Sequence, residues 1–144
     1  MKNIYRAVLI AGLFAQATIQ LAAAQQTQRA VEFQAPFAFQ VESTKLPAGE
    51  YTILEQTGWV QIQTKGGKNA AQVLTIPVVN KDQKAAANSR VVFRNYGGQM
   101  FLAEIWATGQ EKGRELLETK EEQQLARKEK LTRVIVPGQS VAAK

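Results

Sequence analysis

The clearest pattern in the chain is an alternation of apolar and polar residues that begins at Phe33 and resumes up to Ile53. The odd-numbered positions of its first arm carry the apolar residues Phe33, Ala35, Phe37, Phe39 and Val41. A period of two is that of a strand with one buried face. Pro47 and Gly49 then suit a type I turn, after which Tyr51 restarts the alternation. The stretch predicts a β-arch or hairpin on which an all-β core is built.

Further stretches have the periodicity and turn-bounded length of strands. They cover residues 59–64, 70–79, 89–96 and 100–106, and a last one, Leu131 to Val136, is expected to end at Pro137-Gly138. Both faces of 100–106 are mostly apolar. Such a strand is expected only where another part of the chain covers the outside of the sheet.

Residues 111–130 predict one helix. They are rich in good helix formers, with acidic residues early and basic residues late, which complements the helix dipole. The apolar stripe of this helix is thin, so we expect it to rest on the sheet along one line.

These elements predict a mainly β fold. About seven strands, with one C-terminal helix before the last strand, fit a small antiparallel β-sandwich or a barrel, and the pattern does not choose between the two. We expect a single β-rich domain over residues 31–137, a flexible leader over 25–30 and a flexible tail over 138–144.

The beginning of the chain has the three parts of a secretory signal peptide. Lys2 and Arg6 precede an apolar run over 7–15, and Ala22-x-Ala24 is a small-residue cleavage site. The apolar run is shorter than the roughly 20 residues that a spanning helix needs. We therefore predict a signal peptide over residues 1–24, a secreted or periplasmic location, and no membrane span after its removal.

The charge of the chain is modest and spread out. Its net charge is +6, without a dense basic face beside aromatic residues, so we expect no nucleic-acid partner. A weak attraction to anionic envelope surfaces is compatible with this excess, and ordinary solvated charge is the simpler interpretation.

The residue types exclude most enzyme and metal chemistry. The chain has no histidine and no cysteine, which removes most catalytic triads and the ordinary zinc, copper and haem sites. Asp82 is its single aspartate, so no calcium-loop pattern exists. We expect no catalytic residue, no metal ligand and no cofactor.

Two alternatives to a non-enzymatic binding domain remain open. A glycoside hydrolase would use Glu104 with a second carboxylate, such as Glu50 or Glu55, facing it across a cleft. Pairing of Glu104 with Arg90 or Arg94 is the simpler interpretation.

A carrier of a small apolar ligand would have a lipocalin-like order of strands, helix and strand. Its cavity would be lined by Phe37, Phe39, Phe93 and Phe101. Aromatic residues that could line a sugar or lipid pocket are Tyr51, Trp59, Tyr96 and Trp106.

Three segments and the signal peptide together resemble a known group of proteins. The segments are Phe37-Ala38-Phe39-Gln40-Val41, Leu46-Pro47-Ala48-Gly49-Glu50-Tyr51 and Phe101-Leu102-Ala103-Glu104-Ile105-Trp106. In these the chain is similar to uncharacterised small secreted proteins of acidobacteria and related soil bacteria. The resemblance implies no activity and no site residues. The leading hypothesis is an exported, non-enzymatic β-domain that works through binding or envelope interaction, with an unknown protein or envelope component as its partner.

Overall fold

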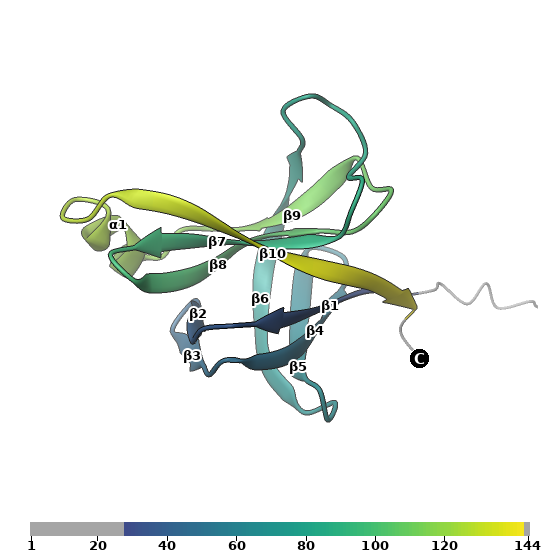
Figure 1. Ribbon diagram of the computed structural model, residues 1–144, viewed down its shortest axis with the longest axis horizontal. Coiled ribbons are helices and arrows are strands. Elements are labelled where there is room, and N and C mark those ends of the chain that lie inside the picture. Colours follow the sequence, from purple (N-terminus) through teal and green to yellow (C-terminus); the bar gives the residue numbers. More distant parts are fainter. Residues whose placement is uncertain (1–27, 143–144) are drawn as a thin grey trace, which may run out of the picture.

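The computed structural model describes residues 28–142, which contain ten strands and one helix (Figure 1). The predicted signal peptide lies outside these residues. The elements in chain order are β1 (Arg29–Ala35), β2 (Phe39–Val41), β3 (Thr44–Leu46), β4 (Gly49–Glu55), β5 (Trp59–Thr64), β6 (Asn69–Val79), β7 (Arg90–Tyr96), β8 (Gln99–Trp106), β9 (Lys112–Leu116), α1 (Lys120–Leu125) and β10 (Leu131–Ala142).

Eight of the strands form a closed antiparallel β-barrel. Their order is β8-β7-β10-β1-β4-β5-β6-β9, and β9 returns to pair with β8. The predicted mainly β fold is confirmed, with one short helix before the last strand, and its architecture is a barrel. The order is not the consecutive one of an up-and-down barrel such as a lipocalin, because β6 pairs with β9 and β7 pairs with β10.

Two long strands, β6 and β10, each pair with both halves of the barrel. One half contains β1, β4 and β5, and the other contains β7, β8 and β9. β10 pairs with β7 over residues 131–137 and with β1 over 138–142. β6 pairs with β5 over 69–74 and with β9 over 75–79. Strands that pass from one sheet to the other at a bend form the corners by which packed sheets join. Figure 1 shows β10 crossing the molecule in this way.

The bend in β10 lies at Pro137-Gly138. A Cβ atom on Gly138 would lie 3.0 Å from the carbonyl oxygen of Glu32, so only glycine lets β10 approach β1 there without displacing a neighbour. The expectation that the strand ends here, with a flexible tail from residue 138, is wrong for residues 138–142, because the Pro-Gly pair bends the strand instead of stopping it. Arg29 and Ala30 of the expected leader likewise belong to β1.

The hydrophobic core fills the inside of the barrel. Phe33 of β1 and Phe93 of β7 pack against Phe39 at 6.1 and 5.2 Å between ring centroids, and Tyr51 lies 5.2 Å from Phe39. Phe39 comes from the β2–β3 hairpin, which pairs with β8 at Gln40. The apolar side chains of this hairpin join the core of the barrel.

Two predicted elements have different bounds. The arm from Phe33 to Val41 is broken after Ala35, since Pro36 cannot donate to a strand ladder and the chain turns into the hairpin. The helix predicted over 111–130 covers only 120–125, because residues 112–116 form β9 and complete the barrel. A Cβ atom on Gly113 would meet the Trp106 ring at 2.7 Å, so β9 lies directly against β8.

The outer face of β7 and β8 is covered, as predicted from the two apolar faces of 100–106. Trp106 and Val92 pack with Ala86 from the loop after β6 and with Val78. Near the other end of these strands, the segment that holds α1 covers Arg94, which is buried. The cover therefore comes mainly from loops, with α1 as a small part.

A buried ion pair fixes α1 to the barrel. Arg94 and Glu122 are 8% and 2% exposed, and Arg94 Nε donates to Glu122 Oε1 at 2.7 Å. Arg94 Nη2 also donates to the Leu116 carbonyl at 3.1 Å. The Thr119 N–H donates to Glu122 Oε2 at 2.9 Å, which completes a capping box at the start of the helix.

Replacing Glu122 by alanine is expected to lower the free energy of unfolding by about 3–5 kcal/mol, because it leaves the Arg94 guanidinium buried without its partner. Urea unfolding followed by circular dichroism measures this. Glu121→Ala, an exposed neighbour on the same helix, is the control and should stay within about 0.5 kcal/mol of wild type. Equal losses in the two variants would contradict a structural role for the ion pair.

Gly138→Ala is expected to lower the free energy of unfolding by about 1–3 kcal/mol, as for other insertions of a methyl group into filled space. Gly66→Ala is the matched control, since a Cβ atom there meets nothing within 4 Å and the φ angle of Gly66 is not positive. The shift of the urea midpoint in each variant measures the effect. If Gly138→Ala is as stable as Gly66→Ala, a methyl group fits between β10 and β1 at this bend and the prediction is wrong.

Candidate functional site

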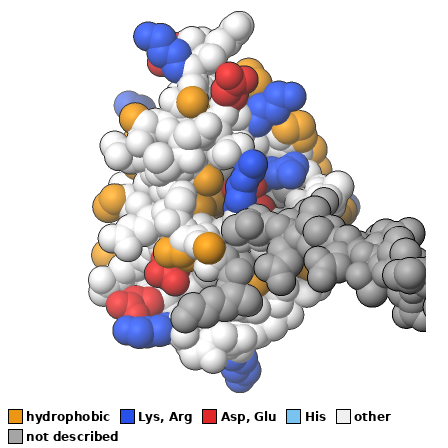
Figure 2. Space-filling model, turned by 90° about the vertical axis from the view of Figure 1, so that its right-hand side faces the viewer, with side chains coloured by type: hydrophobic (Ala, Val, Ile, Leu, Met, Phe, Trp, Pro, Cys, Tyr) orange, Lys and Arg blue, Asp and Glu red, His pale blue; other side chains and the backbone are white. Residues whose placement is uncertain are grey.

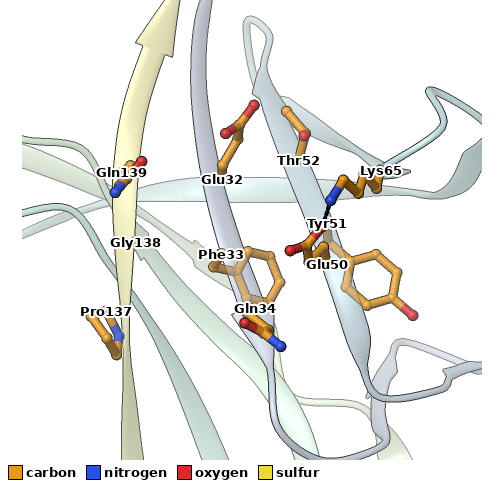
Figure 3. Close-up of a pocket in the computed structure, with 10 residues that line it drawn as sticks. All are labelled: Glu32, Phe33, Gln34, Glu50, Tyr51, Thr52, Lys65, Pro137, Gly138 and Gln139. Carbon is orange, nitrogen blue, oxygen red and sulfur yellow. Dashed lines mark ion pairs between the residues drawn. The ribbon is translucent and has the colours of Figure 1, made fainter.

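A groove lies where β10, β1 and β4 run side by side (Figure 3). Its volume is ≈ 520 Å³. Its polar side chains are Glu32, Gln34, Glu50, Thr52, Lys65 and Gln139. Five of these residues come from β1, β4 and β10, which are joined by the pairing of β1 with its two neighbours, and Lys65 comes from the turn between β5 and β6.

The polar side chains converge because strand pairing places them opposite one another. Glu32 of β1 lies opposite Gln139 on β10 and opposite Thr52 on β4, and Gln34 lies opposite Glu50. The residues between them along the strands, such as Phe33 and Tyr51, belong to the core. The alternation that builds the barrel core therefore also builds a polar outer face.

The groove is hollow because β10 leaves β1 at the bend. The pairing of β1 with β10 stops at Phe33 opposite Gly138, whereas its pairing with β4 continues to Ala35 opposite Gly49. On the β10 side, the groove is lined by Pro137 and Gly138, whose side chains are small or absent. Tyr51 supports the floor: its hydroxyl donates to the Pro47 carbonyl at 2.6 Å, and burial raises its pKa.

One ion pair lies at the margin of the groove. Lys65 Nζ is 2.6 Å from Glu50 Oε2, and Figure 3 shows the two side chains reaching each other. This hydrogen bond, the charge of Glu50 and the further charge of Glu32 raise the pKa of Lys65. Since Lys65 and Glu50 neutralise each other, the groove carries the single uncompensated negative charge of Glu32.

The side chains of the groove can form hydrogen bonds in both directions. Amides donate and accept, the hydroxyl of Thr52 does both, and carboxylates accept. Among residues 28–142, no group of three or more acidic, histidine or cysteine side chains is placed to hold a metal ion. The side chains of the groove thus offer both donors and acceptors of hydrogen bonds.

Glu104 is on β8 and is bound by partners other than those expected. Its carboxylate is bound by Arg133 and by Trp106 Nε1, the latter at 2.9 Å. The expected partners are wrong: Arg90 lies 4.8 Å from the centre of the Trp106 ring, and Arg94 binds Glu122.

The strand order separates Glu104 from the other two carboxylates considered for hydrolysis. Glu50 and Glu55 are on β4, which does not pair with β8 and lies four strands from it in the barrel. The barrel therefore does not bring Glu104 and either of these carboxylates to one cleft.

The phenylalanines expected around an apolar cavity are divided between two places. Phe93 packs edge-on against Phe37 at 5.0 Å and against Phe39 at 5.2 Å between ring centroids, so it contacts both of these rings. Phe101 instead packs against Tyr96 at 5.8 Å, opposite Arg94 and away from the core. Four rings lining one cavity are therefore not found. Of the other aromatic candidates, Tyr51, Tyr96 and Trp106 are buried, and Trp59 is partly exposed.

A second charged cluster lies at one end of the barrel. Glu55 shares the inward side of its strand with Ile53, and its pKa is raised by burial, against the opposing effect of Arg114 and Arg29. Arg114 Nη2 donates to the Gln56 carbonyl at 3.4 Å, and Arg29 donates to the side chain of Gln110. Because both arginines bind parts of the chain, this cluster is part of the framework of the barrel end.

Neither the sequence nor the structure gives a match to a known protein: no family model, no curated protein and no solved structure is similar at a significant level. The similarity to acidobacterial secreted proteins thus stays a resemblance in motifs.

The helical structure of the described residues can be compared with the length and hydropathy that a membrane-spanning helix needs. Across residues 28–142, none of the helical structure is both long and apolar enough to cross a bilayer.

Of the groove residues, only Glu50, as a possible second carboxylate, and Tyr51, as a possible pocket aromatic, are site candidates in the sequence, which does not predict the groove itself. The signal of the groove in the sequence is that positions 32, 34, 50 and 52 carry the polar half of an alternating pattern, which predicts an outward direction. Nothing local indicates that residue 139 pairs with residue 32, because that segment was expected to be a tail.

The raised pKa of Glu55 predicts a pH dependence of stability. Unfolding returns this pKa to its ordinary value of 4.5, so the unfolded chain loses the proton first as the pH rises. Stability present below pH 4.5 is therefore lost as the pH rises through the raised pKa. Urea unfolding from pH 3.5 to 7 should show wild type losing stability relative to Glu55→Gln. A constant difference between the two proteins would contradict the assignment.

Proposed function

We propose that the protein is an exported, non-enzymatic β-domain, and that it binds a polar component of the cell envelope or its surroundings through the groove between β10, β1 and β4. The observation that carries the proposal is the groove itself: ≈ 520 Å³, lined by hydrogen-bonding side chains from three neighbouring strands. Side chains on paired strands of a closed barrel are held in place before the ligand arrives, which reduces the entropy lost on binding.

The chemistry of the residues favours binding over catalysis. Histidine and cysteine do not occur in the chain, Glu104 is held by Arg133 and Trp106, and Glu50 is paired with Lys65. Both carboxylates therefore already have partners within this chain. These residues give support to a binding protein rather than to a hydrolase.

The packing of the barrel favours an outer site over an inner one. Phe33, Phe39 and Phe93 form an aromatic cluster in the core, where a carried apolar ligand would have to lie. The groove, in contrast, is open to solvent and polar. The predicted signal peptide supports a working place outside the cytoplasm, where hydroxyl- and amide-rich envelope material is met.

Blocking the groove should abolish binding to envelope material. Purified protein is mixed with a washed envelope fraction of the source cells and sedimented, and the bound fraction is measured against protein concentration. Thr52→Tyr, which places a large ring in the groove, should weaken binding at least tenfold, about 1.4 kcal/mol. Ile135→Tyr is the matched control, a β-strand position that is 62% exposed on β10 and outside the groove; it should bind as wild type.

Equal binding by Thr52→Tyr and wild type would refute the groove as the binding surface. Native mass spectrometry of the protein from its own compartment tests the alternative of a carrier: a discrete extra mass that is lost on denaturation and belongs to an apolar compound would contradict the proposal in favour of a ligand held in the interior.

A further inference from the structure

The groove continues into a row of polar side chains that crosses half of the barrel. Strand register places Gln139, Glu32, Thr52, Gln63 and Asn69 opposite one another on β10, β1, β4, β5 and β6. We call these five residues the polar row. With neighbouring strands about 4.8 Å apart, the row is about 19 Å long. Four of its five side chains are amides or a hydroxyl, and Glu32 is the only charged one.

A second row lies beside it on β5 and β6. Gln61 is opposite Gln72, and one further step along the strands Trp59 is opposite Leu74. The Leu74 side chain is 71% exposed, and Trp59 is partly exposed. An exposed aliphatic side chain opposite an indole makes a small apolar platform next to a field of amides.

The charge of this face differs from that of the whole chain. The chain has a net charge of +6, but the two rows contain no lysine or arginine. Lys65, at their margin, is paired with Glu50. Figure 2 shows that on one side of the molecule the basic groups are scattered. The rows have no basic side chain that would attract an anionic polymer. An uncharged ligand does not depend on such attraction.

The chemistry that these rows complement is that of a sugar chain. A sugar residue has hydroxyl groups around its edge, which both donate and accept, and C–H groups on its faces. Glutamine, asparagine and threonine side chains offer matching donors and acceptors, and an indole offers a flat apolar surface with a polar edge.

We propose that the outer face formed by the polar row and its neighbours Gln61, Gln72, Trp59 and Leu74 binds a neutral polysaccharide. The hydroxyl groups of several successive sugar residues bond to the row, and an apolar sugar face rests on Trp59 and Leu74. This proposal rests on the proposed function and specifies its ligand class.

An extended peptide is the other polymer to consider, and the topology disfavours it. Peptides usually add to a sheet through an unpaired strand edge. β1, β4 and β5, which carry the middle of the two rows, are each paired on both sides. The groups offered to a ligand here are side chains on a sheet face, which suits hydroxyl-rich rings better than a peptide backbone.

Native affinity gel electrophoresis tests the proposal, with purified protein run through gels that contain dextran, hydroxyethyl cellulose or galactomannan. Wild type should be retarded by at least one of these neutral polymers and not by heparin. The double variant Gln61→Ala/Gln63→Ala should bind at least tenfold more weakly. Gln123→Ala/Gln124→Ala, which removes two exposed amides from α1, is the matched control and should bind within twofold of wild type.

A second variant keeps the test independent of folding defects. Leu74→Glu alters a side chain that is 71% exposed, so its urea midpoint should be unchanged while its retardation falls at least fivefold. Absence of retardation by all three neutral polymers, retardation by heparin alone, undiminished binding in Gln61→Ala/Gln63→Ala, or displacement by an extended peptide would each overturn the proposal. If envelope binding is still lost in Thr52→Tyr, only the ligand class is wrong and the groove keeps its function.

Discussion

The structure depends on the bending of two long strands, β6 and β10, between the two halves of the barrel. A sheet that does not close leaves a row of unpaired backbone groups at each edge, which invites association with other chains. Here each bent strand begins in one half and ends in the other, so every barrel strand finds a partner on both sides. At β10 the close approach of β1 favours Gly138, because a Cβ atom there would lie 3.0 Å from the carbonyl oxygen of Glu32. Without cysteine, closure and core packing must provide the stability that disulfides give to many exported domains.

The same bend explains why the outer face of this barrel is not uniform. Where β10 turns away from β1, the end of β1 loses one neighbour and a hollow forms over residues 32–34. Inside the barrel the opposite happens, since the β2–β3 hairpin inserts Phe39 among Phe33, Tyr51 and Phe93 and fills the space. The filled interior and the groove on the outer face therefore both result from this topology.

Much of the strand content was predictable, because the alternation of apolar and polar residues lies within each segment. Residues 59–64 alternate in polarity and form a strand with the predicted bounds, and 100–106 with its two apolar faces is covered on both sides. Three features were not predictable. Residues 112–116 contain the helix formers Lys, Arg, Glu and Leu around Gly113, yet they form β9, and Leu116 is buried in the barrel core. The Pro137-Gly138 pair is typical of the end of a strand, but here β10 bends at this pair and continues to Ala142. The groove requires residue 139 to pair with residue 32, which no local pattern contains.

The pairing of the first and last strands has a mechanical consequence. Arg29 and Ala142 lie opposite each other at one end of the antiparallel β1–β10 ladder. Tension applied between these two positions pulls on the ladder at its end, so its hydrogen bonds carry the load one after another instead of together. The barrel would therefore open like a zip under a small force, although the same ladder closes it at equilibrium. If the groove is bound to a fixed surface, force applied to either flank of the domain acts first on the strand pair that forms part of the groove.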